Sequence, residues 1–209
     1  MTGSLIARPA GERGYLVDVP EADPARVAAA LRVVAGRRGV GLVDVVPGMS
    51  TVLVVLSDAL PGPAFRALLA EVGREPVTES GESGTITIDV RYDGPDLAEV
   101  ASLSGLSESE VVRVHTGTDF RAAFSGFAPG FVYLTGVPES LRVPRRAAPR
   151  AALPGGSVAL ADQFTAVYPR RSPGGWRLIG TTDVPLWDET RDPPAVIRPG
   201  MTVRFRAVG

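Results

Sequence analysis

The stretch GFAPGFVYLTGVPESLRVPRRAAPRAALPGGSVALADQFTAVYPRRSPGGWRLIG occupies residues 126–180 and decides the fold of the C-terminal part of the chain. Glycine and proline recur in it at short intervals, and each restricts or frees the backbone at its own position. From Phe120 onward short apolar runs alternate with turn signals, which is typical of a closed or nearly closed β-barrel. We therefore expect a β-barrel domain over residues 84–209.

Aromatic rings and arginines are concentrated in the same part of the chain. Of the thirteen Phe, Trp and Tyr residues, ten lie after residue 119, and the stretch from Arg142 to Gly180 holds seven Arg and one acidic residue, Asp162. Rings and guanidinium groups on a turn-rich β segment indicate a binding site for a small anionic molecule.

The preceding residues, 1–83, predict a small α+β domain. Its order is strand, helix, strand, strand, helix, with a further strand after it: strands at 13–19, 40–46, 51–57 and 84–91, helices at 24–35 and 62–72. Asp23 and Pro24 fit the start of the first helix, and Gly36 fits its end. This order predicts a ferredoxin-like sandwich, so the fold class is α+β. Polar residues 73–83 predict a linker.

Two short helices are expected at the start of the barrel domain. The first covers 95–104 and ends at Gly105, and the second covers 108–116 and ends at Gly117. Ser107 and Glu110 have the spacing of a capping box, which starts the second helix. His115 lies in its last turn.

Composition excludes several classes of function. A net charge of −1 argues against a general nucleic-acid binder, and no apolar run is long enough to span a membrane. The chain has no Cys and no Lys, which removes thiolate and lysine chemistry, and its one histidine cannot form a multi-histidine metal centre. We predict no metal site in this chain. The N-terminus lacks a secretion-signal pattern, so we expect a cytoplasmic protein.

Several motifs between residues 115 and 180 resemble those of one known family. They follow in order: His115, Gly126-Phe127-x-Pro129-Gly130-Phe131-x-Tyr133-Leu134, Pro144-Arg145-Arg146, Pro149-Arg150, Pro154-x-Gly156-Ser157-Val158, Tyr168-Pro169, Ser172-Pro173-Gly174-Gly175-Trp176 and Ile179-Gly180. The family is that of the B-type subunit of bacterial 5-oxoprolinase, also called allophanate hydrolase subunit 1, which includes an inhibitor of a sporulation histidine kinase. The resemblance covers residues 85–207 and extends more weakly to 46–49.

The resemblance implies a ferredoxin-like domain, 1–83, followed by a cyclophilin-like β-barrel, 84–209. It also implies an enzyme assembly that opens the lactam of 5-oxo-L-proline to L-glutamate at the expense of ATP. The partners would be a C-type subunit with a homologous barrel and a separate A-type subunit, with ATP bound by the assembly and the chain alone inactive. Two alternatives stay open: a regulatory protein that inhibits a histidine kinase, and a hydrolase subunit for another small, urea-derived amide.

Residue chemistry and the resemblance together give the candidate site. Arginine binds a phosphate or carboxylate through two parallel hydrogen bonds, and histidine titrates near neutral pH. The candidate catalytic residues are His115, Arg145 and Arg150. The candidate substrate-binding residues are Phe127, Pro129, Phe131, Tyr133, Arg146, Ser157, Gln163, Tyr168 and Trp176. The alternatives are a barrel-core role for the rings, a barrel-edge or partner-binding role for the arginines, and helix capping by His115.

The chain departs from the family pattern at a few positions. Phe164 and Ala166 replace a usual Gln and Gly, with Gln163 one position early, and Thr181 replaces a charged or titratable residue. Phe120 and Val132 replace a common Tyr and a frequent Pro. We expect these changes to alter the choice of substrate or to remove a catalytic role.

Overall fold

The structure is a computed structural model that describes residues 5–20, 22–75 and 84–209. The chain divides into two compact units, Met1–Gly81 and Glu82–Gly209. The predicted domain boundary after residue 83 and most of the predicted linker, 73–83, lie outside the described residues.

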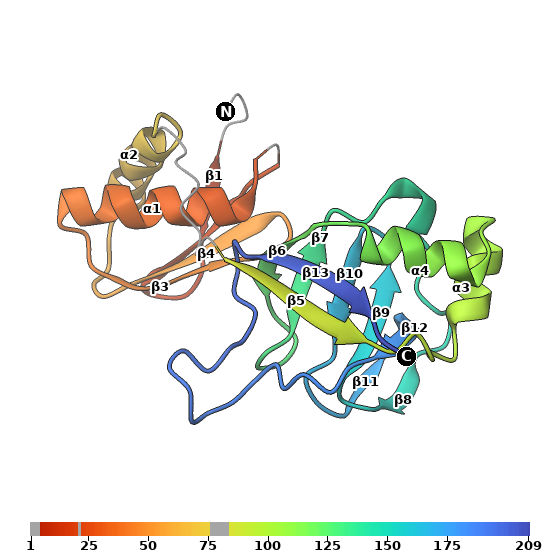
Figure 1. Cartoon of the computed structure of the whole chain (residues 1–209). Helices are drawn as coiled ribbons and strands as arrows, with labels where there is room; N and C mark the ends of the chain where they lie inside the picture. Colours follow the sequence, from red (N-terminus) through yellow and green to blue (C-terminus); the bar gives the residue numbers. More distant parts are fainter. Residues whose placement is uncertain (1–4, 21, 76–83) are drawn as a thin grey trace. The chain divides into compact units, whose positions relative to one another are not determined.

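The first unit is a four-stranded antiparallel sheet with both helices on one face (Figure 1). Its strands follow the order β1-β2-β4-β3. The elements are β1 (Ile6–Pro9), β2 (Gly14–Asp18), α1 (Pro24–Arg38), β3 (Leu42–Pro47), β4 (Thr51–Leu56) and α2 (Gly62–Val72). Alternate residues of β4, Val52, Val54 and Leu56, are buried beneath the helices, where Phe65 of α2 joins them. Every second side chain of β4 therefore points into this core, as expected for a strand with one buried face.

The predicted helix starts of this unit are confirmed, and one predicted helix end is wrong. The Asp23 side chain accepts a hydrogen bond from the Ala25 amide at 2.9 Å. The helix does not stop at Gly36 but continues to Arg38, and Gly39 ends it with φ of 65°. Gly39, and not Gly36, adopts the left-handed conformation that ends the helix. Gly36 is therefore an interior helical residue.

The strand at 84–91 does not complete the first sheet, so the ferredoxin-like prediction is not confirmed. This strand, β5 (Thr85–Val90), pairs in parallel with β13 (Thr202–Ala207) in the second unit. Ile88 and Val90 are fully buried among barrel residues. The edge beside β2 is occupied instead by β1, which the sequence analysis did not predict. Ile88 and Val90, alternate residues of β5, belong to the same core as Val203 and Phe205 of β13, so this strand is part of the barrel.

The second unit is the predicted barrel. Its seven-stranded sheet has the order β12-β9-β10-β7-β6-β13-β5. The remaining strands are β6 (Phe120–Ser125), β7 (Val132–Thr135), β9 (Ser157–Ala161), β10 (Phe164–Val167) and β12 (Arg177–Thr181), while β8 (Arg150–Leu153) and β11 (Ser172–Gly174) form a separate pair. A bridge between Arg91 and Thr181, with N–O distances of 2.8 and 2.7 Å, links the two edges and nearly closes the sheet.

Two helices cover one end of the barrel sheet, α3 (Leu97–Ser104) and α4 (Glu108–Thr116) (Figure 1). Gly105 ends α3 with φ of 68°, and both hydrogen bonds of the Ser107–Glu110 capping box are present. These predictions are confirmed. A short 3-10 turn, η1 (Glu139–Leu141), packs beside them. The barrel interior separates into a main core under these helices and a second, aromatic cluster.

Candidate functional site

The second cluster is a group of interlocking aromatic rings. Phe131 lies at its centre, with ring centroids 5.1 Å from Tyr133, 5.1 Å from Tyr168 and 5.7 Å from Trp176, all edge to face. Phe164 joins from β10 at 5.5 Å from Tyr133. Edge-to-face contacts stabilise ring pairs beyond the burial of their area. Five of the predicted substrate-binding residues are therefore brought together: Phe127, Phe131, Tyr133, Tyr168 and Trp176.

Phe127 is the exposed and strained member of this cluster. It has φ of 66°, a left-handed conformation that costs a residue other than glycine roughly 1–3 kcal/mol. A tight turn holds it there, because Ala128 N donates to Gly126 O at 2.7 Å and Phe131 N to Ala128 O at 3.0 Å. The residue is 59% exposed, and its ring lies edge to face on Phe131 and Tyr168. The fold thus holds an apolar ring at the surface at a cost in free energy.

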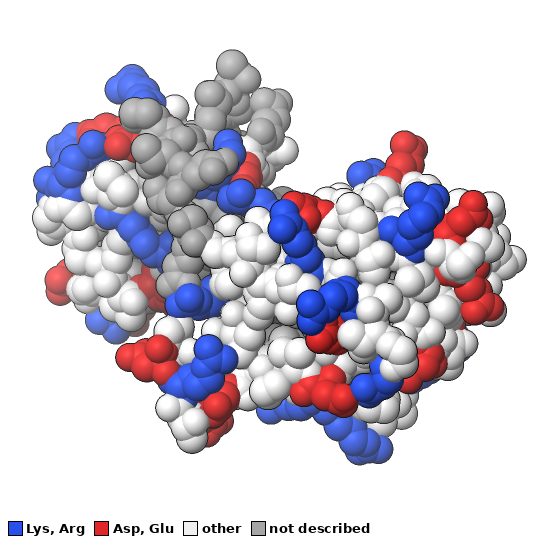
Figure 2. Space-filling model, viewed as in Figure 1, with Lys and Arg blue, Asp and Glu red and all other residues white. Residues whose placement is uncertain are grey.

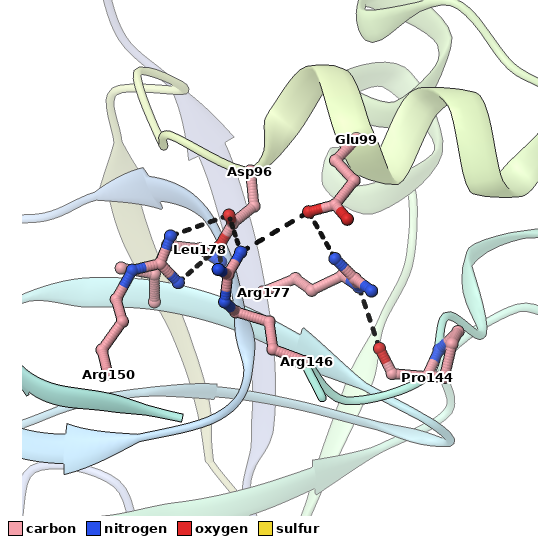
Figure 3. Close-up of polar contacts among 7 residues, drawn as sticks. All are labelled: Asp96, Glu99, Pro144, Arg146, Arg150, Arg177 and Leu178. Atoms are coloured by element: carbon pink, nitrogen blue, oxygen red, sulfur yellow. Dashed lines mark hydrogen bonds and ion pairs between the residues drawn. The ribbon is translucent and has the colours of Figure 1, made fainter. Parts of the chain in front are cut away.

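A buried carboxylate, Asp96, organises the arginines beside the cluster (Figure 3). Arg150 donates to both of its oxygens at 2.8 and 2.9 Å, and Arg146 donates at 2.9 Å. The Leu178 backbone N–H adds a fourth bond at 2.7 Å. Asp96 is 2% exposed. Its burial alone would raise the pKa of the carboxyl group, but the hydrogen bonds and charges of these partners lower it below the usual value.

Glu99 neutralises a third arginine of this group. It pairs with Arg177 and lies 3.6 Å from Arg146, and Arg177 Nε also donates to the Pro144 carbonyl at 2.9 Å (Figure 3). Three guanidinium groups are thus paired with two carboxylates. One donor of Arg146 and two donors of Arg150 bind Asp96, so these bonds compete with the predicted substrate or catalytic contacts of the two arginines. Arg145 is exposed and lies over Gly175, since a Cβ built there would be 3.5 Å from Arg145 Nη2. Asp96 carries no signal of this role in the sequence, because an acidic residue at the start of a helix has the pattern of an ordinary cap.

The structure also argues against a general acid–base role for His115. Its ring is fully buried, stacked 4.5 Å from Phe205, and burial lowers its pKa to about 3. Thr165 donates its hydroxyl proton to Ala159 O at 3.0 Å, so it accepts from His115 Nε2 at 3.1 Å. Nδ1 then accepts from the Tyr92 hydroxyl at 2.7 Å. His115 is a neutral core residue that joins α4 to the barrel, and it does not cap the helix.

This burial predicts a pH-dependent stability that one residue controls. The folded pKa is lowered, so between pH 6.5 and 3 the unfolded chain binds one proton more than the folded chain. The free energy of unfolding should fall by about 2 kcal/mol between pH 7 and pH 5, at 1.36 kcal/mol for each unit of pKa. Urea titrations at these pH values measure it. His115→Gln should abolish the difference, since the sequence has no other histidine; an equal fall in both proteins would contradict the assignment.

The remaining predicted residues divide into buried and exposed ones. Ser157 is 1% exposed and donates its hydroxyl to Pro154 O at 2.8 Å, which argues against substrate contact. Pro129 is exposed in the turn that carries Phe127. Gln163 is exposed in the turn of the β9–β10 hairpin, whose Asp162 N donates to Val143 O at 2.7 Å. These two lie at the surface of the unit that holds the aromatic cluster.

The departures from the family pattern are accommodated by packing and hydrogen bonds. Phe164 and Ala166 are buried in the aromatic cluster. Thr181 donates to Asp93 at 2.8 Å, and Phe120 packs 5.0 Å from His115. A ring at position 164 therefore adds apolar surface where the family pattern has an amide. Phe124 and Phe164 were missed as members of the cluster because strand alternation alone does not show which sheet face forms a second core.

Positive and negative side chains are interspersed on the face that carries β5 and β13 (Figure 2). Arg204 binds Asp119 and Arg206 binds Asp89, each through two hydrogen bonds. That face lacks the broad positive field on which nucleic-acid binding depends. Within the described residues, no helix is long and apolar enough to cross a membrane, and no group of three or more His, Asp or Glu side chains could hold a metal ion.

Comparison with protein families and curated relatives gives consistent matches. The family model described as "Carboxyltransferase domain, subdomain C and D" matches residues 5–197. A protein of Escherichia coli O157:H7, named as the B-type subunit of 5-oxoprolinase, is 44% identical over 172 residues, which cover 78% of this chain and 77% of that protein. A Haemophilus influenzae protein of the same name is 34% identical over 171 residues, covering 80% of each chain.

Solved structures extend the comparison. The crystal structure of TTHA0988 superposes with a TM-score of 0.78 at 36% identity, covering 94% of this chain and 40% of that longer chain. An uncharacterised Pyrococcus horikoshii protein, PH0987, gives a TM-score of 0.58 at 32% identity and 97% coverage of both chains. The Kluyveromyces lactis urea carboxylase shares the fold alone, with a TM-score of 0.76 at 17% identity over 98% of this chain and 22% of its own.

Proposed function

This chain belongs to the family of carboxyltransferase domains, subdomain C and D, whose curated members include proteins named as the B-type subunit of 5-oxoprolinase, and we propose that it serves an ATP-dependent 5-oxoprolinase. It is a component of a 5-oxoprolinase-type system. The observation that supports the proposed 5-oxoprolinase activity is the sequence identity to the Escherichia coli protein over most of both chains. The aromatic cluster beside an arginine-rich segment is consistent with a small anionic substrate.

The proposed reaction hydrolyses the lactam bond of 5-oxo-L-proline. Phosphoryl transfer from ATP to the amide oxygen activates the carbonyl carbon and releases ADP. Water adds to that carbon, and the C–N bond breaks with its nitrogen taking up a proton, which leaves γ-glutamyl phosphate. A second water hydrolyses this acyl phosphate. The products are L-glutamate, ADP and phosphate. In this proposal the chain contributes binding and orientation to the reaction, and its one histidine, which is neutral and buried, transfers no proton. Holding a substrate in one orientation can lower a reaction barrier by several kcal/mol, of the order of 7–11.

The proposal includes an assembly. We propose that a C-type subunit with a homologous barrel and a separate A-type subunit complete the enzyme, and that the assembly binds ATP. The word "subunit" in the names of the relatives supports this, as does TTHA0988, in which this fold occupies 40% of a longer chain. The cyclophilin-like class of the barrel and a cytoplasmic location stay predictions.

Capture of the complete chain with its partners tests the proposed function. We expect a tagged chain, co-expressed with the candidate A-type and C-type subunits, to retain a barrel partner and to form ADP and glutamate in equal amounts only when 5-oxo-L-proline is present. The lactam 2-pyrrolidinone, which lacks the carboxylate, is the control substrate. Partner capture with turnover of a urea-derived amide instead would favour the second enzyme class, and capture of a histidine kinase without a barrel partner would favour a regulatory protein.

A further inference from the structure

The outer edge of β3 lies at the end of the sheet in the first unit. Among the residues that the structure describes, β3 pairs with β4 alone and ends the order β1-β2-β4-β3. Val43 and Val46 on this strand are 66% and 40% exposed. An open edge with apolar side chains can pair with a strand of another molecule, because its N–H and C=O groups are ready to form new hydrogen bonds.

The hydrogen bonds of β4 show which groups of β3 face this edge. Leu56 N donates to the carbonyl of Arg13, the residue before β2, at 2.8 Å. Backbone groups alternate in direction along a strand, so Val54, two residues earlier, also points toward β2. Val54 lies opposite Val45 of β3, and this pair is therefore not hydrogen-bonded. The N–H and C=O groups of Val45 consequently point away from β4, toward the open edge.

Side chains cover both of these groups. Val45 N donates to Asp44 Oδ1 at 2.7 Å, and Val45 O accepts from Arg32 Nη2, on α1, at 2.6 Å. The edge is also interrupted on either side of Val45. The pairing register shifts between Leu42 and Asp44, as at a β-bulge, and Pro47 has no N–H to donate. The centre of the edge therefore has no donor and acceptor ready for a further strand.

The two covered groups are those that a second copy of β3 would use. Two antiparallel β3 strands related by a two-fold axis at Val45 would exchange two hydrogen bonds, from each Val45 N–H to the other Val45 C=O. The sheet would then continue from one molecule into the next. Val43 and Val46 would lie at the junction, where part of their apolar surface would leave water.

We infer that Arg32 and Asp44 act as caps that prevent β3 from pairing with β3 of a second copy of this chain. The guanidinium group occupies the acceptor, and the carboxylate occupies the donor. A second strand has to displace both side chains before it can form its first pair of hydrogen bonds. Hydrogen bonds to charged groups are stronger than those between neutral groups, so this displacement opposes pairing. The caps lie within the first unit, and their role does not depend on the proposed enzyme activity.

Sedimentation of the complete chain over a range of concentrations tests this inference. We expect the double variant Arg32→Ala, Asp44→Ala to form dimers at least about tenfold more tightly than the wild-type chain. Arg32 is exposed and alanine favours a helix, so α1 should remain folded. Adding Val43→Lys should reverse the association, because a charge on an edge strand opposes pairing. The single variants Arg32→Ala and Asp44→Ala should each show a smaller increase, and they serve if the double variant does not fold.

A disulfide between two molecules tests the register of the pairing. In the two-fold arrangement residue 44 of one copy lies opposite residue 46 of the other, and the chain has no cysteine of its own. We expect Asp44→Cys, Val46→Cys in the Arg32→Ala background to oxidise to a covalent dimer. Asp44→Cys in the same background without the second cysteine should form little dimer, because its copies are not opposite one another.

The matched control is Arg66→Ala, Asp58→Ala, which removes an exposed arginine from α2 and an exposed acid after β4. This variant should sediment as the wild-type chain does. Equal association of the two double variants, no increase in Arg32→Ala, Asp44→Ala, or an increase that Val43→Lys does not reverse would each overturn the inference. A wild-type chain that already forms dimers, and that Val43→Lys converts to monomers, would also overturn it, since the edge would then be open.

Discussion

Replacing Asp96 by asparagine is expected to lower the free energy of unfolding by about 3 kcal/mol, because it leaves buried positive charges without their partner. The carboxylate binds Arg146, Arg150 and the Leu178 backbone, and it is 2% exposed. Arg146 and Arg150 are 30% and 26% exposed, so water compensates them in part and the loss stays at the lower end of the usual range. Chemical denaturation of the two proteins measures the difference.

Asp93→Asn is the control for this substitution. Asp93 lies on the same loop, is exposed, and accepts a hydrogen bond from Thr181 at 2.8 Å. Its replacement should change stability by less than about 1 kcal/mol, as expected for an exposed interaction. A similar loss in the two variants would show that the loop tolerates no change, and it would contradict the role given to the buried ion cluster.

The pH dependence of this effect has a defined sign. The folded pKa of Asp96 is lowered, so its contribution is complete above the unfolded value of about 3.9 and is lost as the pH falls through the folded value. The difference between wild type and Asp96→Asn should therefore be constant above about pH 5 and shrink below about pH 4. Between pH 7 and pH 5, where the His115 effect is to be measured, this difference should stay constant.

Gly94→Ala is expected to destabilise the barrel by about 3 kcal/mol or more, because main-chain atoms occupy the space that its methyl group needs. A Cβ at this position would meet the Gly180 nitrogen at 2.5 Å, and the Ile179 carbonyl carbon and the Leu178 oxygen more closely still. All three atoms belong to the backbone of β12 and cannot rotate away. The segment that closes the barrel, which Asp96 N ties to Leu178 O at 3.0 Å, would have to separate from β12.

The same substitution at Gly36 serves as the control and should have the opposite sign. Gly36 lies inside α1, and a Cβ there meets nothing within 4 Å. Alanine should stabilise the helix by roughly 0.5–1 kcal/mol, since it loses less backbone entropy than glycine. Both values follow from denaturation curves. Equal destabilisation by both substitutions would contradict this explanation, because it would show that the close approach of β12 does not determine the loss of stability.

The local features of the fold could be predicted where the sequence contains direct signals. Asp23, Ser107, Glu110 and Gly105 define helix ends through contacts within one turn of the chain, and the structure has them. The partner of β5 could not be predicted this way. Apolar alternation in 85–90 fits either sheet, and the pairing with β13 joins residues more than a hundred positions apart in the chain.

The sequence indicated which residues belong to the candidate site, but it could not show which arginines are held by ion pairs within the protein. The concentration of rings and arginines led to the prediction that Phe127, Phe131, Tyr133 and Trp176 bind substrate. The structure brings these rings together, and their contact with substrate stays a prediction. The sequence could not show that a buried carboxylate 50 or more positions away binds Arg146 and Arg150. Nor could it show that His115 is buried beside Thr165, since a helix end provides no signal of burial.

The most direct test of the account is 5-oxo-L-proline-dependent ADP release by an enzyme assembled from the proposed A-type and C-type partners, with this chain present or omitted. We expect ADP and glutamate to form in equal amounts only when the chain is present, and the Michaelis constant for 5-oxo-L-proline to rise by about tenfold or more with Arg145→Gln. Equal turnover in the presence and absence of this chain would contradict the central claim that it is a working component of a 5-oxoprolinase.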